Sequence, residues 1–275
     1  MVPVLVGTAC SAGRADVVAW RAAAAMLVAV ALQVGTNYAN DYSDGVRGAD
    51  TGERRVGPLR LVGSGLVAAR AVKRAALAGF AVAGVAGAAL AIAVGWELFV
   101  VGAAALAAGW FYTGGPRPYG YLGLGEVFVF VFFGVVATVG SAYVQEEQIS
   151  ALALGASVPV GLLAVALLVI NNLRDIPGDR LSGKRTLAVR LGEVPTRWLY
   201  VAVMATAAVA VVLLAPLSGR LGALLALAAV PMAYRPVVVV LRGERGPALI
   251  PALVDTGRVQ LIFGCLLAAG LWVSA

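Results

Sequence analysis

The chain has 275 residues, of which 61% are hydrophobic and only 13% are charged, whereas a soluble domain carries roughly 25% charged residues. This composition excludes an ordinary water-soluble surface, and the lack of any histidine excludes histidine-dependent triads and histidine-ligated metals. The net charge of +7 fits cytoplasmic loops and anionic ligands, so we expect no nucleic-acid partner.

Apolar segments predict an all-α, polytopic membrane helical bundle of about nine transmembrane helices, because a helix satisfies its own backbone in lipid. The segments are 1–12, 17–40, 66–95, 97–112, 122–145, 149–172, 197–216, 219–241 and 253–274. The first segment is too short for a full span, so we expect a truncated first helix, from a late start codon or a shortened chain. We expect one domain over residues 1–275.

The basic residues predict the orientation of the bundle. If the N-terminus is cytoplasmic, all but three of the 21 Lys and Arg residues fall on the cytoplasmic side. The three exceptions are Arg14, Arg21 and Arg220. Cytoplasmic loops of membrane proteins carry an excess of Lys and Arg. We therefore expect the N-terminus inside and the C-terminus outside a bacterial plasma membrane.

The first acidic cluster, NYANDYSDGVRGAD, follows the second apolar segment and runs from residue 37 to 50. Asn37, then Asn40 or Asp41, and then Asp44 recur at helical spacing and predict one polar face at the end of a helix. Asp50 closes the cluster.

The second acidic cluster, NNLRDIPGDR, runs from residue 171 to 180 after the sixth apolar segment. Asn171, Asp175 and Asp179 stand four apart, so they share a face if the helix continues. Asn172 lies beside them, and Pro177 is a place where the helix can be distorted.

Together, the two clusters predict a magnesium-diphosphate site at the cytoplasmic end. Ionisable residues at membrane depth are functional candidates by default. Mg²⁺ prefers oxygen ligands and is commonly held by one or two carboxylates together with substrate phosphates, and nearby Arg and Lys can take the remaining phosphate charge. The competing interpretation is that these residues only cap helices and solvate loops.

These motifs resemble those of the UbiA superfamily of intramembrane aromatic prenyltransferases. That family has nine helices, an N-D-x-x-D motif followed by a further Asp, and a D-x-x-x-D motif. The corresponding residues here are Asn40, Asp41, Asp44, Asp50, Asp175 and Asp179. Asp50 falls two residues later than in the commonest version of the motif, and a basic stretch that usually precedes the part matching Val2 to Thr8 is missing.

Four stretches in order look like the branch of the family that prenylates 1,4-dihydroxy-2-naphthoate. They are NDYSDGVRGAD, VGPLRLVGSG, YTGGPRPYGYLGLGE and NNLRDIPGDRLSGKRTLAVRLG. The resemblance implies Mg²⁺-dependent transfer from a polyprenyl diphosphate to 1,4-dihydroxy-2-naphthoate. Diphosphate and CO₂ are released, and the product is demethylmenaquinone.

The resemblance also suggests roles for individual residues. The metal ligands and orienting groups would be Asn40, Asp41, Asp44, Asp50, Asn171, Asn172, Asp175 and Asp179, with Asp41, Asp44, Asp175 and Asp179 as the catalytic carboxylates. The diphosphate would meet Arg54, Arg55, Arg60, Lys184 and Arg185. The acceptor would meet Arg117, Tyr112, Tyr119 and Asn37.

Three other functions stay open at this point. The acceptor or donor can differ within the same fold: 4-hydroxybenzoate, homogentisate, haem or a phosphoribosyl donor. A cation-coupled transporter also places carboxylates in a helical bundle, although usually near the midplane. The third is a non-enzymatic scaffold, which would not need paired aspartates on helical faces. The oligomeric state and the length of the polyprenyl chain are not predicted.

Overall fold

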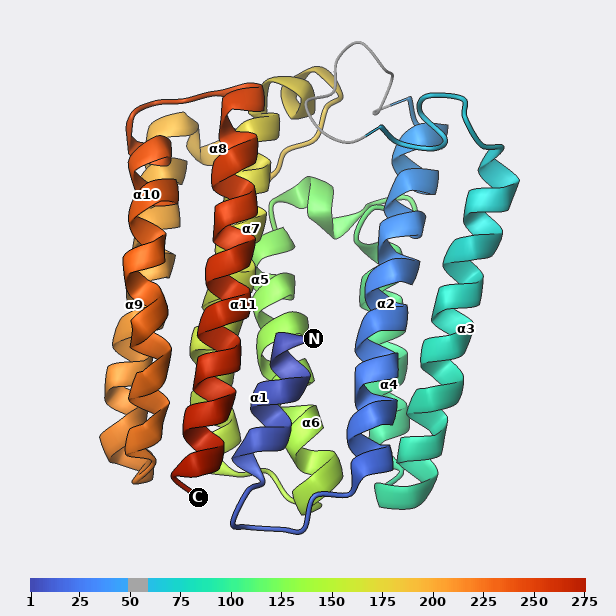
Figure 1. The fold of residues 1–275 in the computed structure, drawn as a ribbon. Coiled ribbons are helices and arrows are strands. Elements are labelled where there is room, and N and C mark those ends of the chain that lie inside the picture. The colour runs from blue at the N-terminus through green and yellow to red at the C-terminus, as the bar shows by residue number, and fades with distance from the viewer. Residues whose placement is uncertain (49–58) are drawn as a thin grey trace.

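The computed structural model describes residues 1–48 and 59–275, and these residues form helices and connections without any β-strand (Figure 1). Seven of the helices are long and apolar enough to cross a membrane. They are α2 (Ala19–Val46), α3 (Ala69–Val94), Gly125–Glu146, α7 (Ala151–Leu181), α9 (Glu193–Ser218), Leu221–Leu241 and Gly246–Val273. The shorter α1 (Val2–Cys10) and α4 (Glu97–Phe111) bring the described helices of the bundle to the predicted nine.

Three of the spans change helix type along their length. The span Gly125–Glu146 consists of α5 (Gly125–Val129), the π-helical η2 (Phe130–Val136) and α6 (Ala137–Glu146). The 3₁₀-helical η3 (Leu221–Ala233) continues into α10 (Tyr234–Leu241), and η4 (Gly246–Leu249) continues into α11 (Ile250–Val273). Two short helices, η1 (Tyr119–Leu122) and α8 (Leu187–Leu191), lie in connections.

Two helices extend well beyond their predicted ends, and both carry an acidic cluster. α2 continues past residue 40 to Val46, and α7 continues past residue 172 to Leu181. Pro177 lies inside α7 without ending it. The apolar pattern stops earlier because polar residues begin there, not because the helix ends.

Helix α7 occupies the centre of the bundle. Of its most apolar window, 61% is buried within the molecule, against at most 39% for the other spans. It packs against the span Gly125–Glu146 at a point where Gly134 and Gly161 meet: a Cβ on Gly134 would lie 2.5 Å from the Cα of Gly161. Small residues of this kind allow membrane helices to approach backbone to backbone. The start of the span Gly125–Glu146 lies beside the second acidic cluster, where Glu126 contacts Asn172.

The ends of α2 and α7, together with η1 and α8, lie at one end of the bundle, at the top of Figure 1. The connection between α1 and α2 and the C-terminus lie at the opposite end. The fold therefore brings both acidic clusters, which are far apart in the sequence, to the same end.

Candidate active site

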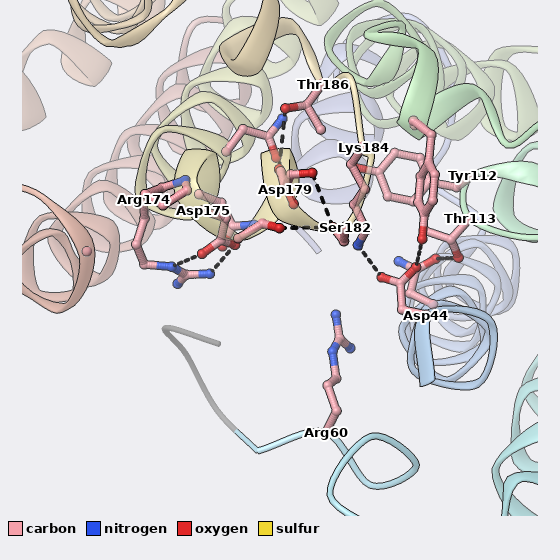
Figure 2. Close-up of a pocket in the computed structure, with 18 residues that line it drawn as sticks. Asp44, Arg60, Tyr112, Thr113, Arg174, Asp175, Asp179, Ser182, Lys184 and Thr186 are labelled. Atoms are coloured by element: carbon pink, nitrogen blue, oxygen red, sulfur yellow. Dashed lines mark hydrogen bonds and ion pairs between the residues drawn. The ribbon is translucent and has the colours of Figure 1, made fainter. Parts of the chain in front are cut away.

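A cavity of about 170 Å³ separates the end of α2 from the end of α7 (Figure 2). Polar and charged side chains supply most of its lining. These are Asn40, Asp44, Arg60, Tyr112, Thr113, Tyr121, Asn171, Asn172, Arg174, Asp175, Asp179, Ser182, Lys184 and Thr186.

On the α2 side, Asp44 is a buried carboxylate with two partners. Its Oδ2 accepts a hydrogen bond from Lys184 Nζ at 2.8 Å, and its Oδ1 accepts one from the Tyr121 hydroxyl at 2.5 Å. Lys184 also lies over the Tyr121 ring, with Nζ 4.9 Å from the centroid. Burial, and then the charge of Asp44, raise the pKa of the Tyr121 phenol. Tyr121 therefore stays protonated and remains a donor.

On the α7 side, Asp175 and Asp179 both line the cavity together with Asn171, as their four-residue spacing predicts. Asp175 receives two hydrogen bonds of 2.7 Å from the buried guanidinium of Arg174. Asp179 accepts a hydrogen bond of 3.3 Å from Thr186, which also caps α8. Each carboxylate is thus oriented by a neighbouring donor.

Asp41 points to a different place from Asp44. Its two carboxylate oxygens accept hydrogen bonds from the backbone N–H groups of Leu61 at 2.9 Å and Val62 at 3.0 Å. One turn further along α2, a Cβ on Gly45 would lie 2.5 Å from the Val62 side chain. This face of α2 therefore holds segment 59–68, and Figure 2 shows Arg60 extending from that segment toward the cavity.

The three asparagines of the cavity differ in their partners. The Asn40 side-chain oxygen accepts a hydrogen bond of 2.8 Å from Thr113. Asn172 donates one of 3.0 Å to the buried carboxylate of Glu126. Asn171 also lines the cavity. Its side chain has no hydrogen-bond partner within the described residues.

The other predicted site residues lie in several places. Tyr112 lines the cavity. Tyr119 stacks on Phe128 with ring centroids 3.8 Å apart, and its hydroxyl donates to the backbone of Ala108. The exposed residues that do not line the cavity are Asn37, Arg117 and Arg185. Asp50, Arg54 and Arg55 lie outside the described residues.

Several residues at or beside the site were not assigned to it from the sequence, among them Arg47, Tyr121, Arg174 and Glu126. Arg47 donates hydrogen bonds to the backbone carbonyls of Thr113 and Gly115 and so ties the α4–η1 connection to α2. Tyr121 and Glu126 belong to the stretch YTGGPRPYGYLGLGE, and Arg174 to the second cluster. These residues belong to the segments that the motifs single out, but their contacts become visible only in three dimensions.

The donor set of the cavity fits Mg²⁺ bound together with a diphosphate. Across residues 1–48 and 59–275, no three acidic, Cys or His side chains gather closely enough to form a metal site alone. Asp44 instead lies across the cavity from Asp175 and Asp179 (Figure 2). Mg²⁺ sites of one or two carboxylates completed by substrate phosphate have this composition.

Known proteins that share one name match this chain over nearly its whole length. A 1,4-dihydroxy-2-naphthoate octaprenyltransferase of Mycobacterium leprae is 47% identical over 270 residues, covering 98% of this chain and 90% of the relative. The protein of the same name from Escherichia coli is 37% identical over 281 residues, covering 98% and 90%.

Solved structures share the fold at lower identity. A UbiA homolog from Archaeoglobus fulgidus bound to GPP and Mg²⁺ has a TM-score of 0.69 at 15% identity, covering 98% of this chain and 94% of that one. An apo UbiA homolog from Aeropyrum pernix has a TM-score of 0.69 at 19% identity, covering 99% and 96%. A model of the UbiA prenyltransferase family matches residues 1–250, and the chain is therefore a member of the UbiA prenyltransferase family.

Proposed function

We propose that the protein transfers a polyprenyl group from polyprenyl diphosphate to 1,4-dihydroxy-2-naphthoate, in a Mg²⁺-dependent reaction that gives demethylmenaquinol (the hydroquinone form of demethylmenaquinone), diphosphate and CO₂. The observation that carries this proposal is the 47% identity, over 98% of the chain, to a relative of that name. The cavity supports the proposal, because carboxylates on two helices face each other across it and basic side chains lie between them. We assign the whole chain, residues 1–275, to one prenyltransferase domain.

The diphosphate would occupy the space between the two acidic clusters. Asp44, Asp175 and Asp179 would hold Mg²⁺ with the side-chain oxygens of Asn40, Asn171 and Asn172. When bound, the metal supplies charge neutralisation for the leaving diphosphate. Arg60 and Lys184 reach the cavity from different segments and would hydrogen-bond the phosphate oxygens as charged donors. Arg54 and Arg55 remain proposed phosphate ligands from the adjoining segment.

The acceptor would lie against Tyr112. This residue lines the cavity, and its ring makes an edge contact with Tyr119 at a centroid distance of 5.4 Å. Burial raises the pKa of the Tyr112 phenol, as does the charge of Glu126, so its hydroxyl remains a donor. An aromatic wall of this kind would hold a flat ring in place by stacking and edge contacts.

Bond changes in the proposed reaction need no covalent enzyme intermediate. The C–O bond between the prenyl carbon and diphosphate breaks, and the electron pair leaves with diphosphate. The ring carbon that bears the carboxylate forms the new C–C bond. The carboxylate carbon then leaves as CO₂ and its bonding pair stays in the ring, so the product is the hydroquinone. The chain's task is to orient both substrates and stabilise the charge on the leaving group.

The surroundings of the site suit an apolar donor. The chain is a multi-pass membrane protein, with seven helices long and apolar enough to span. The polyprenyl tail would run between apolar helix faces into the lipid. We propose that the site faces the cytoplasm, because nearly all Lys and Arg residues lie toward that end of the bundle and basic loops stay cytoplasmic.

The test is a membrane assay that offers 1,4-dihydroxy-2-naphthoate and 4-hydroxybenzoate side by side with polyprenyl diphosphate and Mg²⁺. We expect demethylmenaquinol, or its air-oxidised quinone, only from the first acceptor, its loss on chelation with EDTA, and its loss in Asp175→Ala. Prenylation of 4-hydroxybenzoate alone would overturn the assignment of the acceptor. Product formation that persists in EDTA would overturn the metal dependence.

A further inference from the structure

The carboxylate of Glu126 lies behind the wall of the cavity. Glu126 is 7% exposed and stands in the first turn of the span Gly125–Glu146. Its Oε1 accepts the hydrogen bond of 3.0 Å from Asn172 Nδ2, and its Oε2 is buried without a hydrogen-bond partner among the residues that the structure describes. A negative charge is favourable in the first turn of a helix, which explains an acid here but not its burial against Asn172.

The contact decides which end of the Asn172 amide faces the cavity. An asparagine side chain carries a donor and an acceptor that can exchange places by rotation. The Asn172 Nδ2 group donates to Glu126 Oε1, so this contact holds the nitrogen end of the amide toward Glu126. Asn172 lines the cavity, and its Oδ1 is neither engaged by a protein donor in the described residues nor buried without a partner. The oxygen is therefore the atom available to the cavity.

Helix packing places Glu126 at this position. The span Gly125–Glu146 runs alongside α7, and the two backbones touch at Gly134 and Gly161. Gly125 in turn lies against Tyr112, because a Cβ there would be 3.5 Å from the Tyr112 ring and hydroxyl. The start of this span therefore supports two residues of the cavity wall, Tyr112 and Asn172, from behind.

We propose that Glu126 is a positioning residue that fixes the Asn172 amide so that its oxygen, and not its nitrogen, is presented to the magnesium-diphosphate site. The inference rests on the proposed function, since an oxygen ligand matters only if a cation or a hydroxyl donor occupies the cavity. Glu126 itself does not touch the substrates. Its effect on the reaction passes through Asn172.

The first experiment is a double-mutant cycle of Glu126→Gln and Asn172→Ala in the full-length protein in membranes. Gln can donate as well as accept, so Glu126→Gln leaves the Asn172 amide free to turn. We expect a loss of kcat/KM of roughly 10- to 100-fold, the range seen when an outer partner of a metal ligand is removed. We also expect a rise in the Mg²⁺ concentration needed for half-maximal rate. The double variant should be no worse than Asn172→Ala alone.

Additive losses in the double variant would overturn the proposal, as would wild-type activity in Glu126→Gln. Glu146→Gln is the matched control, because Glu146 ends the same span at the opposite end of the bundle. Its side chain is only 1% exposed, and its ion pair with Arg14 is long, at 3.9 Å. We expect near wild-type kcat/KM and Mg²⁺ dependence from this control.

A second measurement uses thermal unfolding and needs no activity. Asn172→Asp places two carboxylates side by side and should lower the melting temperature. Adding Glu126→Gln restores a hydrogen-bond donor to the pair and should recover most of the lost melting temperature. A double variant no more stable than Asn172→Asp would overturn the pairing. If the wild type transfers no prenyl group, the proposed function fails, while the unfolding data still decide whether Glu126 and Asn172 act as a pair.

Discussion

Asp44 connects three elements of the site through one side chain. Its carboxylate joins α2 to Tyr121 in η1 and to Lys184 in the connection after α7. Asp44→Asn removes the charge and leaves Lys184 without its anionic partner. We expect kcat/KM to fall by roughly 100-fold or more, the magnitude of removing one preorganised electrostatic group, measured by transfer of a labelled prenyl group.

Asp41→Asn is the internal comparison for this prediction. It lies three residues away on the same helix but, within the described residues, accepts only from the backbone of Leu61 and Val62. We expect a smaller loss of activity than in Asp44→Asn, accompanied by a lower melting temperature. Equal losses with unchanged stability would show that Asp41 is itself a ligand in the working enzyme, as its motif position predicts.

Tyr121→Phe tests an orienting contact without disturbing packing. The variant keeps the ring beneath Lys184 and removes only the hydroxyl that donates to Asp44. We expect kcat to fall by roughly 10-fold, the lower end of the range for outer partners of metal ligands, while the protein remains folded. The matched control is Tyr200→Phe, whose hydroxyl shares a hydrogen bond of 2.7 Å with Thr256 and does not line the cavity; an equal loss there would contradict the role of Tyr121.

Residue spacing predicts which acidic side chains share a helix face, but not what fills that face. Asp175 and Asp179 line one cavity as their spacing requires. Asp41 and Asp44 lie close together around the axis of α2. Asp41, however, is hydrogen-bonded by the backbone of a segment that returns to α2 after residue 58. Such long-range partners leave no periodic signal in the sequence. For the same reason Glu126 and Arg174 were not assigned to the site.

At the scale of elements, α2 makes different contacts on two of its faces near its C-terminal end. One face carries Asp44 toward the cavity, and the other, with Asp41 and Gly45, receives segment 59–68. The position of Arg60 therefore depends on how closely this segment approaches α2. A side chain at Gly45 would increase that separation.

Gly45→Ala is expected to displace Arg60 and weaken binding of the diphosphate. The new Cβ would lie 2.6 Å from Val62 Cβ and 3.1 Å from the Gly63 backbone nitrogen, so the segment must move. A misplacement of about 1 Å can cost up to roughly 100-fold in rate, and we expect a rise in KM for polyprenyl diphosphate above all. Gly84→Ala in α3, where a Cβ meets nothing within 4 Å, should behave as wild type. Equal kinetics of the two variants would contradict this account.

The ends of the long helices show why apolar pattern alone underestimates them. Prediction from hydropathy stops α7 at residue 172, whereas the helix runs to Leu181 with Asp175, Pro177 and Asp179 inside it. These polar residues are helical because they line a cavity enclosed by other elements, where their partners offset the cost of burial. The sequence cannot reveal that enclosure: the four-residue spacing of Asn171, Asp175 and Asp179 places them on one face only if the helix continues.

At the scale of the whole molecule, the number of helices and the gathering of both acidic clusters at one end were predictable from the sequence. The number of helices follows from the length of the apolar segments. The shared end of the clusters follows because successive connections lie at alternate ends of the bundle. The cavity itself was not predictable in this way. It depends on how α7 packs against its neighbours, including the close approach to the span Gly125–Glu146 at Gly134 and Gly161.

Orientation in the membrane is the remaining prediction at this scale, and single-cysteine labelling measures it directly. Of the two native cysteines, Cys10 is buried and Cys265 is exposed, so the background variant is Cys265→Ser. Gln148→Cys and Arg242→Cys are exposed positions in connections at opposite ends of the bundle. With the site facing the cytoplasm, a membrane-impermeant maleimide applied to intact cells should label Gln148→Cys and reach Arg242→Cys only after permeabilisation. The reverse pattern would place the magnesium-diphosphate site outside, away from cytoplasmic substrates, and would contradict the charge-based assignment.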